Sequence, residues 1–462
     1  TALTSKAFGT SSIMIGDDAT GTIDAANYNV GLGVDVFAAL TTGDNNVAIG
    51  FQALKSNTTG HSHVAVGYAA LDANTTGIEN VAVGHNALTS NTTGASNVAV
   101  GPFALRDVTT GQSNTALGYA AAYLTTTASN NTAVGNLALG ANTTGTENVA
   151  VGALALDANT TAHENTAIGY LTLSANTTGG ANTALGAAAL RNNTTAANNT
   201  AIGRTAMQSN TTGANNTAVG KEALKVNTTG AGNTGVGFTA LDACTTGAYN
   251  VAVGYDSIGK LTTASNNTAI GNSGLNNCTT GEGNTCIGKA SGDVITTSGS
   301  NTLVGRDTDT SSATSAGHEI AIGANAVGKG ASTGFINPNG GGVYQGNNST
   351  TWSQTSDERI KKNIVDNNVG LEKIKNIQVR NFEYKLPEEI SDGLTETDAI
   401  DKQGIQLGVI AQELETILPD MVTTESTGCK TVDADNMTWY LVNAVKELSA
   451  EVQELKKQLE NK

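Results

Sequence analysis

Few residues of this chain have the type and spacing that chemistry requires. His61-Ser62-His63 places two imidazoles one residue apart, an arrangement that can bind a metal ion. The motif occurs once, and His63 replaces an asparagine of the internal repeat described below. We therefore expect two solvent-facing histidines in a turn, with a metal site at His61 and His63 as the less favoured alternative, and no cofactor.

Carboxylates are too scattered to form an obvious acid–base pair. Hydrolysis of a glycan would need two of them about 5–10 Å apart in a cleft. Asp72, Asp157 and Asp242 share one position of the repeat but lie five repeats apart. Glu147 and Glu164 stack one repeat apart, without an accompanying aromatic platform. We expect no catalytic activity in the repeat region.

The four cysteines show no metal-binding or redox spacing. Cys244, Cys278, Cys286 and Cys429 contain no C-x-x-C pair. Cys244 and Cys278 lie 34 residues apart, which is two repeats, or roughly 10 Å in a stack of strands and too far for a disulfide. Free thiols fit assembly in a reducing cytoplasm.

Composition and charge divide the chain into two regions of different character. Gly is 55 of 462 residues and aromatics are 4%, so any core must be built from small residues in register. The net charge is −16: residues 356–462 hold 13 basic and 21 acidic groups, and the remainder hold 11 and 19. Neither part is basic, which disfavours nucleic-acid binding. We find no signal peptide and no long apolar run, so we expect no export and no membrane insertion.

A 17-residue repeat runs through most of the chain. A glycine follows an apolar triplet sixteen times at a spacing of 17, from Gly50 to Gly305, without insertion or deletion. Gly33 and Gly16 continue this register backwards, and Gly323 continues it forwards after one extra residue. One copy cannot bury its own apolar face, whereas a stack of copies can, so the repeat predicts a β-solenoid.

Each repeat position has a physical reading. The opening asparagine, as in Asn46 or Asn80, predicts a hydrogen-bonded ladder along the stack. A three-residue strand follows, with Ala between β-branched residues, and the glycine permits φ > 0 or close approach at a corner. An Ala-Leu pair points inward, and Asn-Thr-Thr-Gly makes the return turn, where we expect left-handed geometry at Asn and Gly. We expect the strand's Ala face to be the surface where neighbouring chains pack.

The N-V/T-A-V-G half of each repeat resembles the head repeats of the YadA-like trimeric adhesins. That resemblance implies a trimer of parallel β-rolls. The repeats of that family are usually shorter than 17 residues. The alternative architecture is a monomeric solenoid.

The sequence texture changes after a Gly-rich joint. Ser356-Asp357-Glu358-Arg359-Ile360-Lys361 opens the new segment, and Gly408-Val409-Ile410-Ala411-Gln412-Glu413 stands further on. Near the end, apolar residues recur at spacings of 4, 3, 4, 3 and 4, from Leu441 to Leu459. This is a heptad seam with charged flanks and predicts an oligomerising coiled coil.

Residues 352–462 resemble the intramolecular chaperone domain of endosialidase-type phage tailspikes and fibres. The S-D-x-R-x-K start, the G-x-I-A-Q-E block and the terminal helix carry this resemblance. It implies that the segment trimerises the chain, nucleates folding of the upstream β-structure, and then cuts itself off.

The same resemblance implies the residues that would cut. Ser356 would be the nucleophile that attacks the carbonyl of Thr355, so the scissile bond is Thr355-Ser356, and Lys361 would be the general base. Asp357 would orient either group or cap a helix. Arg359 would stabilise the oxyanion or pair with a carboxylate of a neighbouring chain.

The sequence therefore predicts a mainly β protein: a homotrimeric parallel β-solenoid shaft followed by an α+β chaperone domain that ends in a trimeric coiled-coil helix. We expect degenerate coils at 1–45, the repeat shaft at 46–317, the last coil and Gly-rich joint at 318–351, and the chaperone domain at 352–462, with the coiled coil at about 437–460.

The expected function is a structural, receptor-facing phage tail fibre in the virion, assembled in the host cytoplasm. The expected partners are two further copies, a host surface receptor that is a glycan or an outer-membrane component, and other tail proteins at the amino-terminal end. The alternatives are a bacterial surface adhesin of the YadA type and, less favoured, a glycan-depolymerising tailspike. The one enzymatic activity that the sequence suggests is self-cleavage by a Ser/Lys pair, and whether it occurs is left open.

Overall fold

A computed structural model describes residues 4–8, 11–16, 25–314, 317–337, 343–346, 353–354, 358, 361–390, 400, 402–424 and 428–461. The chain divides into two compact units, Thr1–Thr355 and Ser356–Lys462. The first is built almost entirely of short strands and turns, and the second combines helices with two small hairpins.

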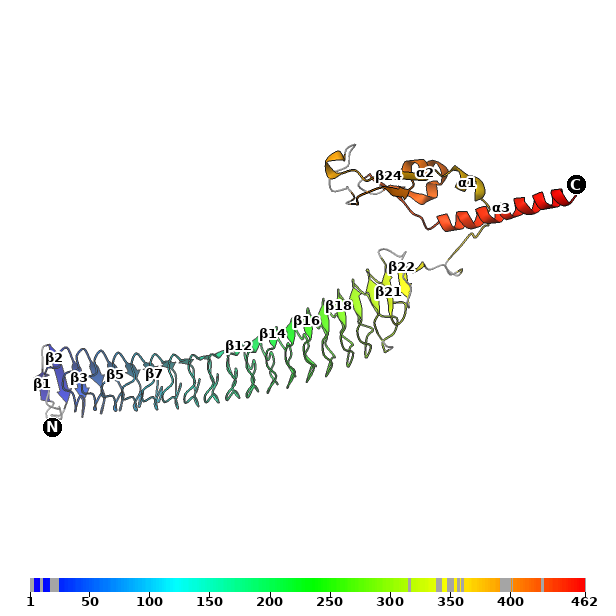
Figure 1. The fold of residues 1–462 in the computed structure, drawn as a ribbon. Helices are drawn as coiled ribbons and strands as arrows, with labels where there is room; N and C mark the ends of the chain where they lie inside the picture. Colours follow the sequence, from blue (N-terminus) through cyan, green and yellow to red (C-terminus); the bar gives the residue numbers. More distant parts are fainter. Residues whose placement is uncertain are drawn as a thin grey trace. The chain divides into compact units, whose positions relative to one another are not determined.

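The first unit is a parallel β-solenoid, which confirms the predicted mainly β solenoid shaft and leaves its trimeric state a prediction (Figure 1). One short strand per coil stacks on the next in sequence order. The strands are β1 Thr4–Phe8, β2 Ser12–Gly16, β3 Val30–Gly33, β4 Val47–Ile49, β5 Val64–Val66, β6 Val81–Val83, β7 Val98–Val100, β8 Thr115–Leu117, β9 Thr132–Val134, β10 Val149–Val151, β11 Thr166–Ile168, β12 Thr183–Leu185, β13 Thr200–Ile202, β14 Thr217–Val219, β15 Thr234–Val236, β16 Val251–Val253, β17 Thr268–Ile270, β18 Thr285–Ile287, β19 Thr302–Val304, β20 Ile320–Ile322, β21 Thr333–Ile336, β22 Val343–Gly346 and β23 Ser353–Gln354.

The strand register follows the sequence period. Val149 pairs with Thr166, an offset of 17 residues, and the same offset joins β2 to β3 through Ile13 and Val30. Between β19 and β20 the offset is 18, because Thr302 pairs with Ile320. The backward and forward continuations of the repeat are thus confirmed. Antiparallel pairs stand at both ends, β1 with β2 and β21 with β22.

The alanine of each strand lies inside its own coil, so our prediction that it faces a neighbouring chain is wrong. Ala150 is fully buried, whereas Val149 and Val151 on either side of it point outward and are half-buried. The Ala-Leu pair also points into the interior and is buried, as predicted. At Gly235, which replaces this alanine, an added Cβ would already touch the Leu224 side chain at 3.4 Å. Most coils carry Ala at this inward strand position, although Cys286 and Leu303 are also accommodated there, fully buried.

Two asparagine ladders run through the stack. The backbone N–H of Asn46 donates to Oδ1 of Asn29 (2.9 Å), one coil earlier, and its side-chain amide donates to the Gly60 carbonyl (3.2 Å). This confirms the predicted ladder. The asparagine of the Asn-Thr-Thr-Gly turn forms a second one, with Nδ2 of Asn74 donating to Oδ1 of Asn57 (2.9 Å). Both sets are buried, and these bonds satisfy polar groups that burial would otherwise penalise.

The corner glycines have the predicted geometry, but the turn does not. Gly203 has φ 136°, a conformation that L-residues rarely adopt. The left-handed geometry expected at Asn and Gly of the turn occurs instead at residues such as Gln52 (φ 57°) and Leu54 (φ 52°). Their N–H groups donate to adjacent coils, to Val34 at 2.9 Å and Ala70 at 3.1 Å. These bonds offset the cost of left-handed backbone in residues with a Cβ.

The second unit contains three α-helices and two hairpins in its described residues: α1 Leu371–Asn376, β24 Arg380–Phe382, β25 Gln406–Gly408, α2 Ala411–Ile417, β26 Val422–Thr424, β27 Lys430–Val432 and α3 Met437–Glu460. Strands β24 and β25 pair antiparallel, as do β26 and β27. Two 3₁₀ turns, Pro387–Glu389 and Pro419–Met421, complete these elements.

Two glycines three residues apart provide a test of the coil geometry. Gly271 has φ 142°, and an added Cβ would clash with the Gly288 carbonyl, whereas a Cβ on Gly274 would meet its nearest atom at an ordinary 3.5 Å. We predict that Gly271→Ala lowers the free energy of unfolding by about 1–3 kcal/mol. Gly274→Ala should raise it by about 0.4–1 kcal/mol, because most coils carry Ala there. Amide hydrogen exchange in the adjacent coils would measure both, and equal effects would contradict this account.

Candidate functional site

The predicted cleavage residues lie at the boundary between the two units. Ser356, Asp357, Arg359 and the Thr355-Ser356 bond fall outside the described residues, so their arrangement remains a prediction. Lys361 is described: its side chain is exposed, and its backbone N–H donates to the Glu358 carbonyl at 3.0 Å. The second unit begins at Ser356, so the predicted scissile bond is the peptide link between the units.

The residues that follow are fastened to helix α3. Gly370 approaches the backbone of Ala444 so closely that no side chain would fit. Glu447 Oε2 accepts the N–H of Leu371 (3.1 Å), which satisfies a free donor at the start of α1. The Asn443 amide donates to the Asn367 carbonyl (2.7 Å). Residues 367–371 and the terminal helix are therefore one folding element.

The second unit has only a small apolar core among its described residues. Leu414, Leu418 and Met421 are buried. The Tyr440 hydroxyl at the edge of this core donates to the Asp420 carboxylate (3.0 Å), and burial together with this bond raises the pKa of Tyr440. Outside the core, Arg380 pairs with Glu413 (2.9 Å) on the surface. So little buried apolar surface stabilises a unit of this size weakly by itself.

Helix α3 exposes its apolar seam. In the single chain, Ala444 is the only buried residue of α3 among those described. The heptad residues are all exposed: Leu441 46%, Val445 66%, Leu448 49%, Val452 42%, Leu455 57% and Leu459 73%. This exposed aliphatic row is the heptad pattern from which the sequence predicts a coiled coil, and the coiled coil itself stays a prediction.

The two histidines of the H-x-H motif differ sharply. His61 is exposed, as expected, but His63 is buried, so the prediction of two solvent-facing histidines is wrong for His63. His63 continues the first asparagine ladder. Its Nδ1 accepts the N–H of Asn80 (3.1 Å), and its Nε2 donates to the Gly77 carbonyl (2.8 Å). Both ring nitrogens are thus engaged within the stack, in the neutral Nε2–H tautomer. No group of three or more metal-ligating side chains occurs among the described residues.

The remaining titratable groups of the shaft are structural. Burial raises the pKa of Asp72, Asp157 and Asp242, each in its own distant coil. Cys244 and Cys278 replace asparagines of the second ladder, and burial raises the pKa of both thiols to about 11. Their thiolate forms are therefore scarce at neutral pH, so these cysteines are poor nucleophiles and poor metal ligands.

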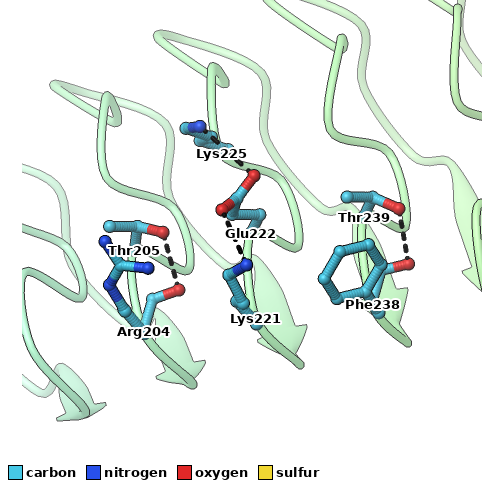
Figure 2. A network of polar contacts seen from close by, with 7 residues as sticks. All are labelled: Arg204, Thr205, Lys221, Glu222, Lys225, Phe238 and Thr239. Carbon is cyan, nitrogen blue, oxygen red and sulfur yellow. Dashed lines mark hydrogen bonds and ion pairs between the residues drawn. The ribbon is translucent and has the colours of Figure 1, made fainter.

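Our sequence reasoning missed one surface feature, the column of residues directly after each corner glycine. We call it the post-corner column. Figure 2 shows Arg204, Lys221 and Phe238 of this column on three successive coils. Lys221 lies 5.1 Å from the Phe238 ring centroid, and it also pairs with Glu222 at 3.4 Å. Reading every seventeenth residue from Phe51 onward would have revealed the column, because aromatic and basic residues dominate it.

Comparisons with known proteins find a similarity in the second unit. Residues 356–423 match a family model described as chaperone of endosialidase. No curated protein and no solved structure matched the chain. Within the described residues, no helix is long and apolar enough to cross a membrane. A parallel β-solenoid followed by this chaperone segment fits a protein of the phage tail fibre or tailspike type.

His63 generates a prediction about acid sensitivity. Burial lowers its pKa from 6.5 to about 4, so the folded state binds fewer protons than the unfolded state between these values. Its coils should keep full stability above about pH 6.5 and lose up to about 3 kcal/mol as the pH falls to 4.

The change that tests it is His63→Asn, which restores the ladder residue found in neighbouring coils. Amide exchange at residues 47–83, corrected for the intrinsic rate at each pH, should show acid-induced opening in the wild type and much less in the variant. Equal opening in both proteins would contradict the assignment.

Proposed function

We propose that the chain is a homotrimeric phage tail fibre or tailspike-type protein. In this proposal the solenoid is the structural, receptor-facing shaft, and residues 352–462 drive trimerisation and folding. The observation that carries it is the endosialidase-chaperone match directly downstream of the solenoid. Two unpartnered apolar surfaces, one in each unit, support the trimer.

The first surface is the outward row of each strand in the shaft. Its third position is Val, Ile or Leu in every three-residue strand of the solenoid. Several of these side chains are well exposed, including Leu117 at 49% and Leu185 at 45%. Further copies of the same chain carry the same row at the same spacing. They can therefore cover it coil by coil, with closed symmetry and without a change of register.

The second surface is the seam of α3. Three such helices in parallel would bury the exposed leucines and valines in one coiled coil. They would also hold the three shafts in alignment at one end. Parallel pairing of distant strands is slow, with exposed edges until it is complete. A trimeric seed at the carboxy-terminal end removes the need for three chains to find register by themselves.

Self-cleavage is a further part of the proposal. Ser356 Oγ would attack the Thr355 carbonyl carbon as Lys361 takes the hydroxyl proton. The carbon–nitrogen bond then breaks, the Ser356 amine receives the proton, and water hydrolyses the ester to leave the Thr355 carboxylate. A lysine acts as a base only when its ammonium is desolvated. Because Lys361 is exposed in the single chain, the proposal requires that assembly covers it.

Assembly is tested by molar mass. One chain has a mass of 46.6 kDa, so we expect about three times that value by light scattering of the uncleaved protein. Replacing Leu448 and Val452 with Asp should abolish the trimer, because charges cannot be buried in the seam. Glu454→Asp, off the seam, is the control and should leave the mass unchanged. A monomeric wild type with a folded shaft would contradict the proposal.

Cleavage is tested on denaturing gels of freshly expressed protein. We expect the wild type to lose the 107 residues after Thr355, and Ser356→Ala to stay at full length. Ser353→Ala, three residues upstream, should still be cut. Full-length bands for all three proteins would refute the Ser/Lys proposal and leave the role in trimerisation untouched.

A further inference from the structure

The post-corner column changes character along the shaft. From Gly50 to Gly305 the residues directly after the corner glycine are Phe51, Tyr68, His85, Pro102, Tyr119, Asn136, Ala153, Tyr170, Ala187, Arg204, Lys221, Phe238, Tyr255, Asn272, Lys289 and Arg306. Five of the first eight residues carry aromatic rings, whereas all four Lys and Arg residues lie among the last eight. Arg204 is the first of these cations.

Most rings of the column pack on one another. Phe51 stacks on Tyr68 with centroids 5.3 Å apart, and Tyr68 stacks on His85 at 5.0 Å. Phe238 and Tyr255 stack at 5.5 Å. The spacing of about 4.8 Å between coils brings such rings into contact. These rings stabilise the stack, and their faces are largely used by their neighbours.

Tyr170 is different, because alanines flank it in the column. Ala153 stands one coil before it and Ala187 one coil after, and no ring contact of Tyr170 occurs among the described residues. Its side chain is 56% exposed. Backbone hydrogen bonds join the three coils: the Ala188 N–H donates to the Tyr170 carbonyl (2.9 Å), and the Thr205 N–H donates to the Ala187 carbonyl (3.0 Å). The ring therefore stands on a fixed backbone, and the neighbouring column positions carry only the methyl groups of alanines.

Beyond the gap at Ala187 lies a concentration of positive charge. Arg204 is exposed and makes no ion pair within the described part of the chain. Lys221 and Lys225 follow, bridged by one carboxylate, Glu222, at 3.4 and 3.3 Å (Figure 2). Asp242 in the next coil also interacts with the charge of Lys225. Three cations and two carboxylates therefore leave a local net charge of +1 on a chain whose total is −16. So local a reversal of sign attracts an anionic ligand.

We infer that the post-corner column from Tyr170 to Lys221, together with the neighbouring Lys225, binds an acidic glycan, with one sugar ring seated over Ala187 between Tyr170 and Arg204. Two coils separate these residues by about 10 Å, twice the separation of stacked rings. A pyranose offers an apolar face to the tyrosine. Its carboxylate would accept the paired N–H groups of the arginine, and Lys221 would meet the next acidic sugar.

This inference rests on the proposed receptor-facing role of the shaft and adds the class of receptor. A glycan fits better than a protein partner for two reasons. The gap is one alanine wide, which admits a single ring, and the column continues along the axis at a constant spacing, as a polysaccharide does. The charged face is also a poor candidate for the interface between copies, because burying incompletely paired charges there would weaken that interface. The outward aliphatic row is the surface proposed for that interface.

The test uses the full-length protein on an array of oligosaccharides that contain uronic or sialic acids, each beside its carboxyl-reduced neutral counterpart. We expect saturable binding to at least one acidic glycan, with loss of binding to its neutral form and weakening at high salt. Tyr170→Ala and Arg204→Ala should each weaken binding about tenfold or more. Ala187→Phe should abolish it, because the added ring closes the gap while continuing a column that elsewhere accepts Phe.

The control is Tyr249→Ala, which removes a 67% exposed tyrosine from another column and should leave binding unchanged. No saturable binding to any acidic glycan would overturn the inference, as would binding that Ala187→Phe and Arg204→Ala leave intact. Molar mass is measured first on every variant. A trimer without glycan binding refutes this inference alone, whereas a folded monomer refutes the proposed assembly.

Discussion

The bond between one coil and the next is the interaction on which the rest of this structure depends. A 17-residue turn encloses too little space for an ordinary hydrophobic core, and its strands are only three residues long. Buried asparagines compensate by bonding both to the coil before and to a carbonyl of the coil after, as Asn46 does. Because each coil is stabilised by its neighbours, the fold depends on a regular period. The sequence keeps that period through sixteen corner glycines, one in each successive coil.

Under the proposed function, the same constraint explains why such a shaft is joined to a carboxy-terminal unit that assists folding. A stack stabilised only by nearest neighbours has no favourable starting point, since the first coil has nothing to bond to. The second unit supplies apolar surface of the opposite kind, concentrated in one helix and left uncovered in a single chain. The small apolar cluster of its described residues, Leu414, Leu418 and Met421, and its long exposed seam suit a module whose stability comes from association.

Much of this could be read from the sequence, and the failures have physical causes. Strict periodicity predicts the register, the ladder and the corner glycines, because each depends only on which residues recur. Alternation along a strand shows that Ala and Val face opposite ways, but not which side is the interior. The packing of the closed coil decides that: it places Ala inside in most coils, with Cys286 and Leu303 as larger buried exceptions. The left-handed Leu54 could not be foreseen, because its conformation is stabilised by a hydrogen bond to the next coil.

The candidate sites divide along the same line. The segment that begins at Ser356 was recognisable from motifs, whereas the burial of His63 required knowing that its repeat position points inward. The post-corner column can be found by reading every seventeenth residue of the sequence. Its proposed binding role, however, depends on the small residues in the column as much as on the aromatic ones. Tyr170 matters because Ala153 and Ala187 beside it are small, and that contrast is visible only once the coils are stacked.

The constant register also determines how this molecule can change. Inward positions are locked by the neighbouring coils, while outward positions such as those of the post-corner column can vary from coil to coil without disturbing the stack. Loss or gain of one repeat would shift the shaft by a single step of about 4.8 Å and leave every remaining contact in place. The length of such a shaft can therefore change in evolution only by whole repeats, whereas the outward residue of each coil can be substituted independently of the others.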